Sequence, residues 1–231
     1  MIGGSPHPRI SKISRTRIKF CGLVRAEDIV FASRLGVDAL GFVFYPKSPR
    51  YLELEDALAL RRAVPSYVAC VGLFVNADPA LVQAYRSKLG LDVVQFHGDE
   101  TLEHIHQSLA SSGQCPPFWR ALRVKPDSDL LELGARTPGA EALVLDAYSE
   151  AFGGAGERFN WSLAKKLPPE RIILSGGLDS ESVVEGMAGL RPFAVDVSSG
   201  IQAEHARAKS PERMEQFVAA VQNADFLKVS R

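Results

Sequence analysis

The amino-acid sequence predicts a single-domain (β/α)8 barrel of the TIM type, an α/β fold. Three observations support this fold class. Short apolar segments recur about eight times along the chain, stretches with helical periodicity lie between them, and polar residues or glycines follow most of the segments. A length of 231 residues with 46% hydrophobic composition is sufficient for one such barrel.

The apolar segments have the length of β-strands and are uniformly apolar instead of alternating with polar residues. Such runs are typical of parallel strands that are buried on both faces under helices. Successive segments start roughly 20 to 30 residues apart, as repeated strand-helix units require. We predict the eight strands at residues 17–21, 39–44, 67–75, 93–96, 118–122, 142–145, 171–174 and 194–197.

The stretches between these segments repeat apolar residues at the spacing of an amphipathic helix, and the clearest predicted helices are 26–35 and 54–63. Eight evenly spaced units favour a closed barrel over the alternative, an open doubly wound sheet. The loop-forming stretch 111–117 fits a connection between the fourth helix and the fifth strand. Residues 1–16 lack apolar periodicity, so we predict a flexible N-terminal leader there and the barrel domain at 17–231.

Composition and charge narrow the class of partner. Lysine plus arginine equals aspartate plus glutamate at 27 each, which gives no indication of nucleic acid or an anionic membrane as partner. The longest uninterrupted apolar run, 68–75, is far shorter than the roughly 20 residues of a membrane-spanning helix. The first residues lack the apolar core of a secretory signal. We expect a cytoplasmic protein that acts on a small phosphorylated molecule, as a monomer or a homodimer.

The three cysteines, Cys21, Cys70 and Cys115, are odd in number and widely spaced, which disfavours a disulfide framework and a metal site. Cys70 lies within a predicted strand and Cys115 in a loop, so both are interpreted as structural. Cys21 ends the first strand, where a barrel places its chemistry. Strand periodicity puts Lys19 on the same face, and a nearby ammonium group lowers the pKa of a thiol. The alternative for Cys21 is a small buried hydrophobic residue.

Asp146 ends the apolar run 142–145, so its carboxyl group is expected to be partly removed from water. Such an environment favours the protonated form and a general-acid role, although a loop hydrogen bond is the alternative. The glycine-rich stretch 153–156 that follows is interpreted as a flexible loop or a mobile lid. His97 follows the fourth strand, and structural and substrate-contacting roles both remain open for it.

The loops after the last two strands are rich in small residues, at Gly176 and Gly177 and at 198–200. In phosphate-binding barrels these two loops hold the phosphate through backbone N–H groups, although turn formation alone also explains the glycines. Arg50 lies in the loop after the second strand. Its guanidinium group is either a surface cation or a bidentate partner for a carboxylate.

The chain from about residue 17 to its C-terminus resembles the phosphoribosylanthranilate isomerase family, the barrel enzymes of tryptophan biosynthesis. Each matching motif is short, but their number and order make the resemblance specific. The motifs are Lys19-Phe20-Cys21-Gly22, the run 41–51, the run 94–98, Leu145-Asp146, the run 153–156, the run 174–178, and Asp196-Val197-Ser198-Ser199-Gly200. Phe20, Val24 and Phe96 differ from the residues usual in the family. These differences affect the expected positioning of the substrate and leave the assignment of the catalytic residues unchanged.

The resemblance implies an acid-base Amadori rearrangement of N-(5-phosphoribosyl)anthranilate to 1-(2-carboxyphenylamino)-1-deoxyribulose 5-phosphate, without a cofactor or a metal. It implies that Asp146 is the general acid and Cys21 the general base. It also implies that Arg50 contacts the anthranilate carboxylate and that the last two loops hold the phosphate. The residues expected to bind substrate are Lys19, Arg50, His97, Gly176, Gly177, Asp196, Ser198, Ser199 and Gly200.

Two other kinds of protein compete with this interpretation. One is a neighbouring phosphate-binding barrel, an indoleglycerol-phosphate synthase or a ribulose-phosphate epimerase. The catalytic Lys and Glu set of the synthase and the metal-binding His and Asp set of the epimerase are not evident in the sequence. The other is a barrel without catalytic activity that serves as a binding module. The presence of both Cys21 and Asp146 argues against it, and a turnover assay separates the two.

Overall fold

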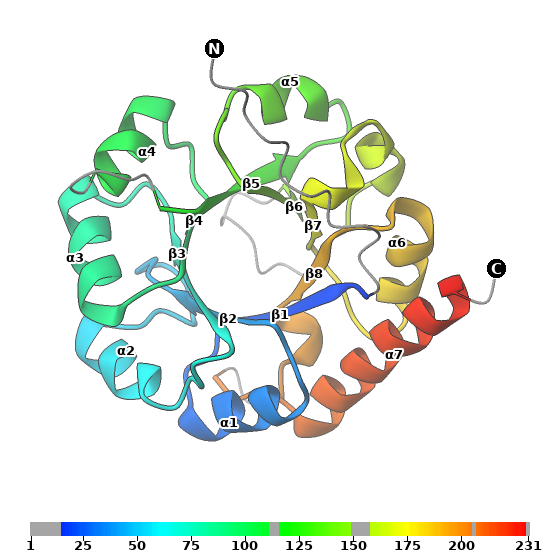
Figure 1. The fold of residues 1–231 in the computed structure, drawn as a ribbon, viewed down its shortest axis with the longest axis horizontal. Helices are drawn as coiled ribbons and strands as arrows, with labels where there is room; N and C mark the ends of the chain where they lie inside the picture. Colours follow the sequence, from blue (N-terminus) through cyan, green and yellow to red (C-terminus); the bar gives the residue numbers. More distant parts are fainter. Residues whose placement is uncertain (1–14, 111–115, 149–157, 205–206, 230–231) are drawn as a thin grey trace, which may run out of the picture.

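Eight parallel strands close into a barrel in which each strand pairs with its neighbour in the chain and β8 pairs with β1 (Figure 1). The structure is a computed structural model that describes residues 15–110, 116–148, 158–204 and 207–229. The strands are β1 (Arg17–Cys21), β2 (Ala39–Val43), β3 (Ala69–Phe74), β4 (Val93–Phe96), β5 (Phe118–Val124), β6 (Ala142–Ala147), β7 (Ile172–Leu174) and β8 (Ala194–Val197). The closed strand order confirms the predicted TIM barrel and rules out the open doubly wound sheet.

Helices surround the strands on the outside of the barrel (Figure 1). They are α1 (Ala26–Arg34), α2 (Leu54–Arg61), α3 (Pro79–Leu89), α4 (Leu102–Leu109), α5 (Leu130–Ala135), α6 (Ser182–Leu190) and α7 (Pro211–Val229). Short 3-10 helices add η1 (Trp161–Lys166), η2 (Pro169–Arg171) and η3 (Ser199–Ile201). Local signals set the helix ends: the Asp78 side chain accepts a hydrogen bond from the N–H of Ala80 at the start of α3, and Gly90 ends that helix in a left-handed conformation.

The two faces of each strand have different surroundings. Outward side chains such as Phe20, Phe42 and Phe74 pack with the helices in the main hydrophobic core. Inward side chains form smaller apolar layers inside the barrel, for example Ala121, Ala142, Val144, Ile173 and Ala194. Because successive residues of a strand point to opposite faces, this alternation decides which polar residues reach the barrel interior.

Most predicted strands agree with the structure to within two residues at each end, and β5 and β6 extend two residues beyond their predicted ends. Arg15 and Thr16, the described residues of the predicted leader, contact residues of the barrel. The Thr16 side chain is buried and donates to Asp225 of α7 over 2.8 Å, and Arg15 pairs with Asp38 over 2.6 Å. The rest of the predicted leader, the glycine-rich stretch 153–156 and Cys115 lie outside the described residues.

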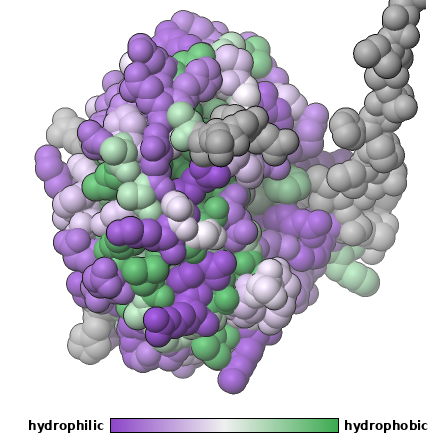
Figure 2. Space-filling view, turned by 60° about the vertical axis from the view of Figure 1, so that its left-hand side comes forward, coloured by the Kyte–Doolittle hydropathy of each residue, from purple (hydrophilic) through white to green (hydrophobic). Residues whose placement is uncertain are grey.

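The outer surface is mixed in polarity. On the face shown in Figure 2, hydrophobic residues lie among hydrophilic ones. Within the described parts of the chain, none of the helices is both long and apolar enough to cross a membrane.

Candidate active site

The carboxyl ends of all eight strands open at one mouth of the barrel, because the strands are parallel and consecutive. Inward-facing polar groups gather there. Cys21 ends β1, His97 follows β4, Asp146 lies near the end of β6 and Ser198 follows β8. The fold therefore brings the two predicted proton-transfer residues to the same mouth from different strands.

Cys21 is buried at 6% exposure and packs beside an apolar wall formed by Val43, Leu73 and Val75, with Tyr45 against it. A glycine on the neighbouring strand makes the space for the thiol, since a Cβ at Gly41 would lie 2.8 Å from the Cys21 Sγ. The wall is suited to one face of an aromatic ring.

Lys19 and Asp196 form a buried ion pair below Cys21, with 2.6 Å between Lys19 Nζ and Asp196 Oδ2. Their strands are hydrogen-bonded neighbours, and Lys19 lies opposite Asp196 in the register. Burial disfavours the charged lysine, but Asp196 and Cys21 outweigh burial and raise the pKa of Lys19. The other carboxylate oxygen, Asp196 Oδ1, is buried without a hydrogen-bond partner in the structure.

Lys19 lowers the pKa of the Cys21 thiol, as predicted, but the net shift of that pKa is upward. Burial raises the pKa of the Cys21 thiol, and the opposing attraction of Lys19 is weakened because Asp196 next to it raises the thiol pKa as well. In the structure without substrate, the thiol form is thus favoured. A base at this position needs further positive charge to ionise.

Asp146 is buried at 8% exposure and lies 3.2 Å, Oδ2 to Nε2, from His97. The other ring nitrogen of His97 lies 3.0 Å from the Gln95 side-chain nitrogen. Gly176 makes room for the carboxyl group, since a Cβ there would lie 2.9 Å from Asp146 Oδ1 and 2.7 Å from the Ala147 nitrogen. Gln95 was not anticipated from the sequence, although its inward position follows from strand periodicity once His97 is placed.

The loop after β4 that carries His97 is fixed by a buried ion pair. The Glu100 carboxylate binds the Arg120 guanidinium over 2.5 Å and accepts hydrogen bonds from the N–H groups of Gly98 and Asn76. Arg120 also donates to the carbonyl of Gly98 over 3.0 Å. This network positions His97, and through it Asp146, from outside the mouth.

Arg50 lies across the mouth next to β1 and β8, where its side chain covers Gly22 so closely that a Cβ on that glycine would overlap it. Its Nε and Nη2 atoms both bind Gln202 Oε1, at 2.9 and 2.8 Å. Burial lowers the pKa of Arg50, and Cys21 opposes that effect. Arg50 is therefore a half-buried cation at the mouth and not a surface residue.

The two small-residue loops predicted to hold a phosphate lie against each other. Gly176 and Gly177 have positive φ angles of 82° and 61°, a conformation that favours glycine. Gly200 packs so tightly on the backbone of Leu178 that a Cβ would overlap its carbonyl oxygen. The loops after β7 and β8 thus form one continuous rim, in which Ser198 and Ser199 also lie.

Ser198 connects this rim to Cys21. Its hydroxyl group donates to the Cys21 carbonyl over 3.0 Å, and it lies beside the buried side chain of Lys209. Lys209 was missed from the sequence, because it precedes α7 in a polar stretch with no strand or motif to mark it.

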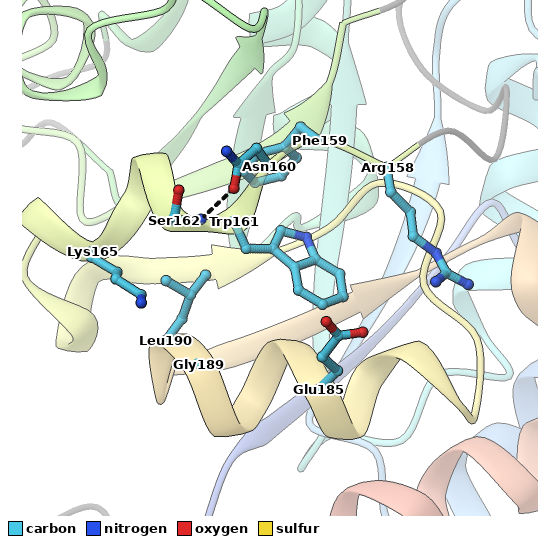
Figure 3. Close-up of a pocket in the computed structure, with 9 residues that line it drawn as sticks. All are labelled: Arg158, Phe159, Asn160, Trp161, Ser162, Lys165, Glu185, Gly189 and Leu190. Atoms are coloured by element: carbon cyan, nitrogen blue, oxygen red, sulfur yellow. Dashed lines mark hydrogen bonds between the residues drawn. The ribbon is translucent and has the colours of Figure 1, made fainter.

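The outer face of the barrel carries a separate pocket of about 430 Å³ between η1 and α6. Figure 3 shows the Trp161 indole beside Glu185, with Arg158 at one side. None of the residues predicted to be catalytic or substrate-binding lines it. Arg158 reaches the rim itself, since its side chain donates to the carbonyl of Gly177 over 3.2 Å.

The described parts of the chain contain no group of three or more His, Cys, Asp or Glu side chains arranged as metal ligands. The described cysteines, Cys21 and Cys70, are both free and buried. Cys70 lies in the outer core, where burial raises its pKa to about 12, in agreement with a structural role.

Comparison with known proteins links this mouth to one family. The family described as N-(5'phosphoribosyl)anthranilate (PRA) isomerase matches residues 18–220. The N-(5'-phosphoribosyl)anthranilate isomerase of Dechloromonas aromatica is 43% identical over 211 residues, covering 91% of this chain and 98% of that protein. The phosphoribosyl anthranilate isomerase structure from Thermotoga maritima has 34% identity and a TM-score of 0.80, covering 90% and 99% of the two chains. A third match, at 33% identity and a TM-score of 0.77, covers the same shares and is a phosphoribosyl anthranilate isomerase in complex with reduced 1-(o-carboxyphenylamino)-1-deoxyribulose 5-phosphate.

Proposed function

The chain belongs to the N-(5'-phosphoribosyl)anthranilate isomerase family, and from that premise we propose that Cys21 and Asp146 perform the two proton transfers of its reaction. The protein is an isomerase of tryptophan biosynthesis that converts N-(5'-phosphoribosyl)anthranilate to 1-(2-carboxyphenylamino)-1-deoxyribulose 5-phosphate. The observation that supports the roles is that both side chains end at the same barrel mouth, one on β1 and one on β6.

Asp146 acts first, as the general acid. Its protonated carboxyl group donates a proton to the ring oxygen of the ribose, and the bond from that oxygen to C1 breaks. The lone pair of the anthranilate nitrogen forms a C=N bond to C1, which gives an open-chain Schiff base with a positive charge. His97, at 3.2 Å, holds the carboxyl group in place for this transfer.

Cys21 then acts as the general base on C2. The thiolate takes the C2 proton, the released electron pair forms a C1–C2 double bond, and the Schiff base nitrogen becomes neutral. The enolamine that results tautomerises to the ketone product. Because burial favours the neutral thiol in the empty site, the Schiff base cation one bond away from C2 supports thiolate formation in the complex.

The remaining predicted contacts position the substrate. The apolar wall of Val43, Leu73 and Val75 is suited to the anthranilate ring, and Arg50 lies within reach of the same side of the mouth as a partner for its carboxylate. The rim formed by Gly177 and by residues 198–200 presents backbone N–H groups for the phosphate. In this arrangement the anthranilate ring and the phosphate bind at different sides of the mouth, and the sugar carbons lie between Cys21 and Asp146.

The test is turnover of purified protein, followed as the decay of anthranilate fluorescence on substrate generated in the cuvette. Cys21→Ala and Asp146→Asn are each expected to lower kcat at least about 100-fold, the contribution of one proton-transfer group. Cys70→Ala and Asp56→Asn are the matched controls, since one removes a buried thiol outside the mouth and the other an exposed carboxylate on α2. Near-wild-type kcat in Cys21→Ala, with cooperative unfolding retained, would move the base to another residue, with His97 the next candidate.

We also infer a cytoplasmic location, which the two free cysteines support because such thiols are usual in a reducing compartment. Whether the protein is a monomer or a homodimer is a question for light scattering. One of the similar solved structures comprises monomers generated from a dimeric phosphoribosylanthranilate isomerase of Thermotoga maritima, so both states are compatible with this fold.

A further inference from the structure

Lys209 is a buried lysine that the proposed mechanism does not use. It is 3% exposed and precedes α7. Its Nζ donates to the Ser198 carbonyl oxygen over 2.9 Å and lies 3.4 Å from the Ser198 hydroxyl oxygen. In the described parts of the chain the ammonium group makes no ion pair. A lysine that is nearly fully buried without a carboxylate partner is costly, because its ammonium group loses water without gaining a counter-charge.

The lysine is held in place from two sides. Its backbone N–H donates to Asp28 of α1 over 3.1 Å, and it bridges Gln202 in an antiparallel pairing. The side chain is thereby directed at the loop after β8 and not at solvent. Asp28 of α1, Gln202 and the rim loop thus fix the position of the ammonium group.

Through Ser198 the lysine is connected to the proposed base. Lys209 contacts the Ser198 carbonyl and hydroxyl oxygens, and that hydroxyl donates to the Cys21 carbonyl over 3.0 Å. The chain of contacts therefore runs from Lys209 to the phosphate rim and then to the backbone of Cys21.

The charges around Lys209 are mixed. Burial and, to a smaller extent, the Arg50 guanidinium lower the pKa of Lys209, whereas Cys21, Asp196 and Asp28 raise it, and the net result is a pKa of about 7. In return, Lys209 lowers the pKa of the Cys21 thiol, as does Lys19. The two groups are coupled, so ionisation of the thiol and protonation of the lysine favour each other.

Of the three basic side chains near Cys21, Lys209 is the one that neither a carboxylate of the described residues nor the proposed substrate neutralises. Lys19 is neutralised by Asp196 at 2.6 Å. Arg50 binds the uncharged Gln202 in the structure, and the proposed function assigns its charge to the substrate carboxylate. Lys209 contacts only oxygens of uncharged groups through its ammonium group.

We propose that Lys209 is a positioning residue of this active site, whose ammonium group fixes Ser198 in the rim and whose positive charge favours the thiolate form of Cys21. The inference rests on the proposed function, since it assumes that a thiolate at Cys21 serves the reaction. It explains how a buried thiol next to a neutralised lysine is able to ionise.

Three substitutions separate the hydrogen bond from the charge. Lys209→Gln keeps a donor for Ser198 without the charge, Lys209→Arg keeps both, and Lys209→Met removes both. Lys88→Met, at an exposed position of α3, is the control for loss of a lysine. The readout is the rate at which iodoacetamide alkylates Cys21 as a function of pH, measured on the Cys21 peptide by mass spectrometry, because alkylation needs the thiolate and not turnover.

At pH 7.5 we expect Cys21 in Lys209→Gln and Lys209→Met to be alkylated about tenfold more slowly than in wild type, with the inflection about one pH unit higher. Lys209→Arg and Lys88→Met should stay within about twofold of wild type. In turnover, Lys209→Gln should lower kcat with KM nearly unchanged. Lys209→Met should also raise KM, because the rim loses its anchor at Ser198.

Superimposable alkylation profiles for all variants would overturn the role of Lys209. If Lys209→Met does not fold, the comparison of Gln with Arg still decides, because those two differ in charge and both retain a donor. Failure of the proposed function is distinguishable, since it would appear as full turnover in Cys21→Ala whatever the Lys209 variants do to alkylation.

Discussion

His97 Nε2 lies 3.2 Å from Asp146 Oδ2, and this contact joins the loop after β4 to the carboxyl group on β6. Gln95 contacts the other ring nitrogen at 3.0 Å, so the ring is held from both sides. His97 is thus not an isolated core histidine. It is the hydrogen-bond partner of the proposed acid.

His97→Ala is therefore expected to lower kcat by about tenfold or more, because Asp146 loses the group that orients it for proton transfer. The measurements are kcat and the far-UV circular dichroism spectrum. A lower kcat with an unchanged spectrum would show that the substitution affects the site and not the fold. His106→Ala, at an exposed position of α4, is the control. Equal kcat for both variants would mean that the contact does not contribute to catalysis.

Arg50→Ala should raise KM for the anthranilate substrate more than it lowers kcat, because a carboxylate contact far from the reacting carbons binds substrate and transition state alike. Steady-state kinetics measure both constants. Lys47→Ala changes an exposed cation in the same loop and serves as the control. Unchanged kinetics for Arg50→Ala would exclude the carboxylate contact.

Gly200→Ala tests the phosphate rim, since its Cβ would overlap the Leu178 carbonyl oxygen and separate the loops after β7 and β8. We expect weaker binding of inorganic phosphate by calorimetry and a higher KM. Gly189→Ala in α6 is a matched control, because no atom lies within 4 Å of its added Cβ. If both variants bind phosphate equally well, the anion does not bind at the rim formed by the loops after β7 and β8.

Asp196→Asn should destabilise the fold by about 3 to 5 kcal/mol, because it leaves the buried ammonium group of Lys19 without its counter-charge. Denaturant unfolding at pH 7.5 measures the loss of unfolding free energy. The double variant Lys19→Met with Asp196→Leu should recover much of it, since neither charge is then buried. A single variant as stable as wild type would show that the pair contributes little.

The lowered pKa of Lys209 predicts that the free energy of unfolding depends on pH. Its pKa is about 7 in the folded protein and near 10.5 in the unfolded chain, so between these values the unfolded state binds more protons. Wild type should therefore gain stability relative to Lys209→Met as pH rises from 7 to 10, by roughly 3 kcal/mol. Urea unfolding of both proteins across this range measures the difference. A constant difference would show that Lys209 is charged throughout.

Several features of the site followed from the sequence. Uniformly apolar strand segments at regular spacing indicated a closed parallel barrel, and in such a barrel the strand ends converge. That convergence brings Cys21, Asp146 and the two glycine-rich loops to one mouth. Strand periodicity also placed Lys19 on the inner face with Cys21, which the structure confirms.

Other features depended on contacts that no local pattern encodes. Lys19 lowers the pKa of the Cys21 thiol as predicted, but burial and Asp196, on the adjacent β8, raise that pKa and outweigh it. Gln95 was missed, and the contact between His97 and Asp146 was not predicted. No sequence pattern marks Lys209. Its contact with Ser198 depends on how the chain folds between β8 and α7.

The sequence by itself determined the fold, the mouth and the identities of the groups that line it, because apolar periodicity and strand-end position are local properties of the chain. Only the tertiary structure decided how those groups are charged and held. Burial and neighbouring charges act through space, and apart from Lys19 the residues that act on the charge of Cys21 or contact Asp146 come from strands and loops distant in the sequence.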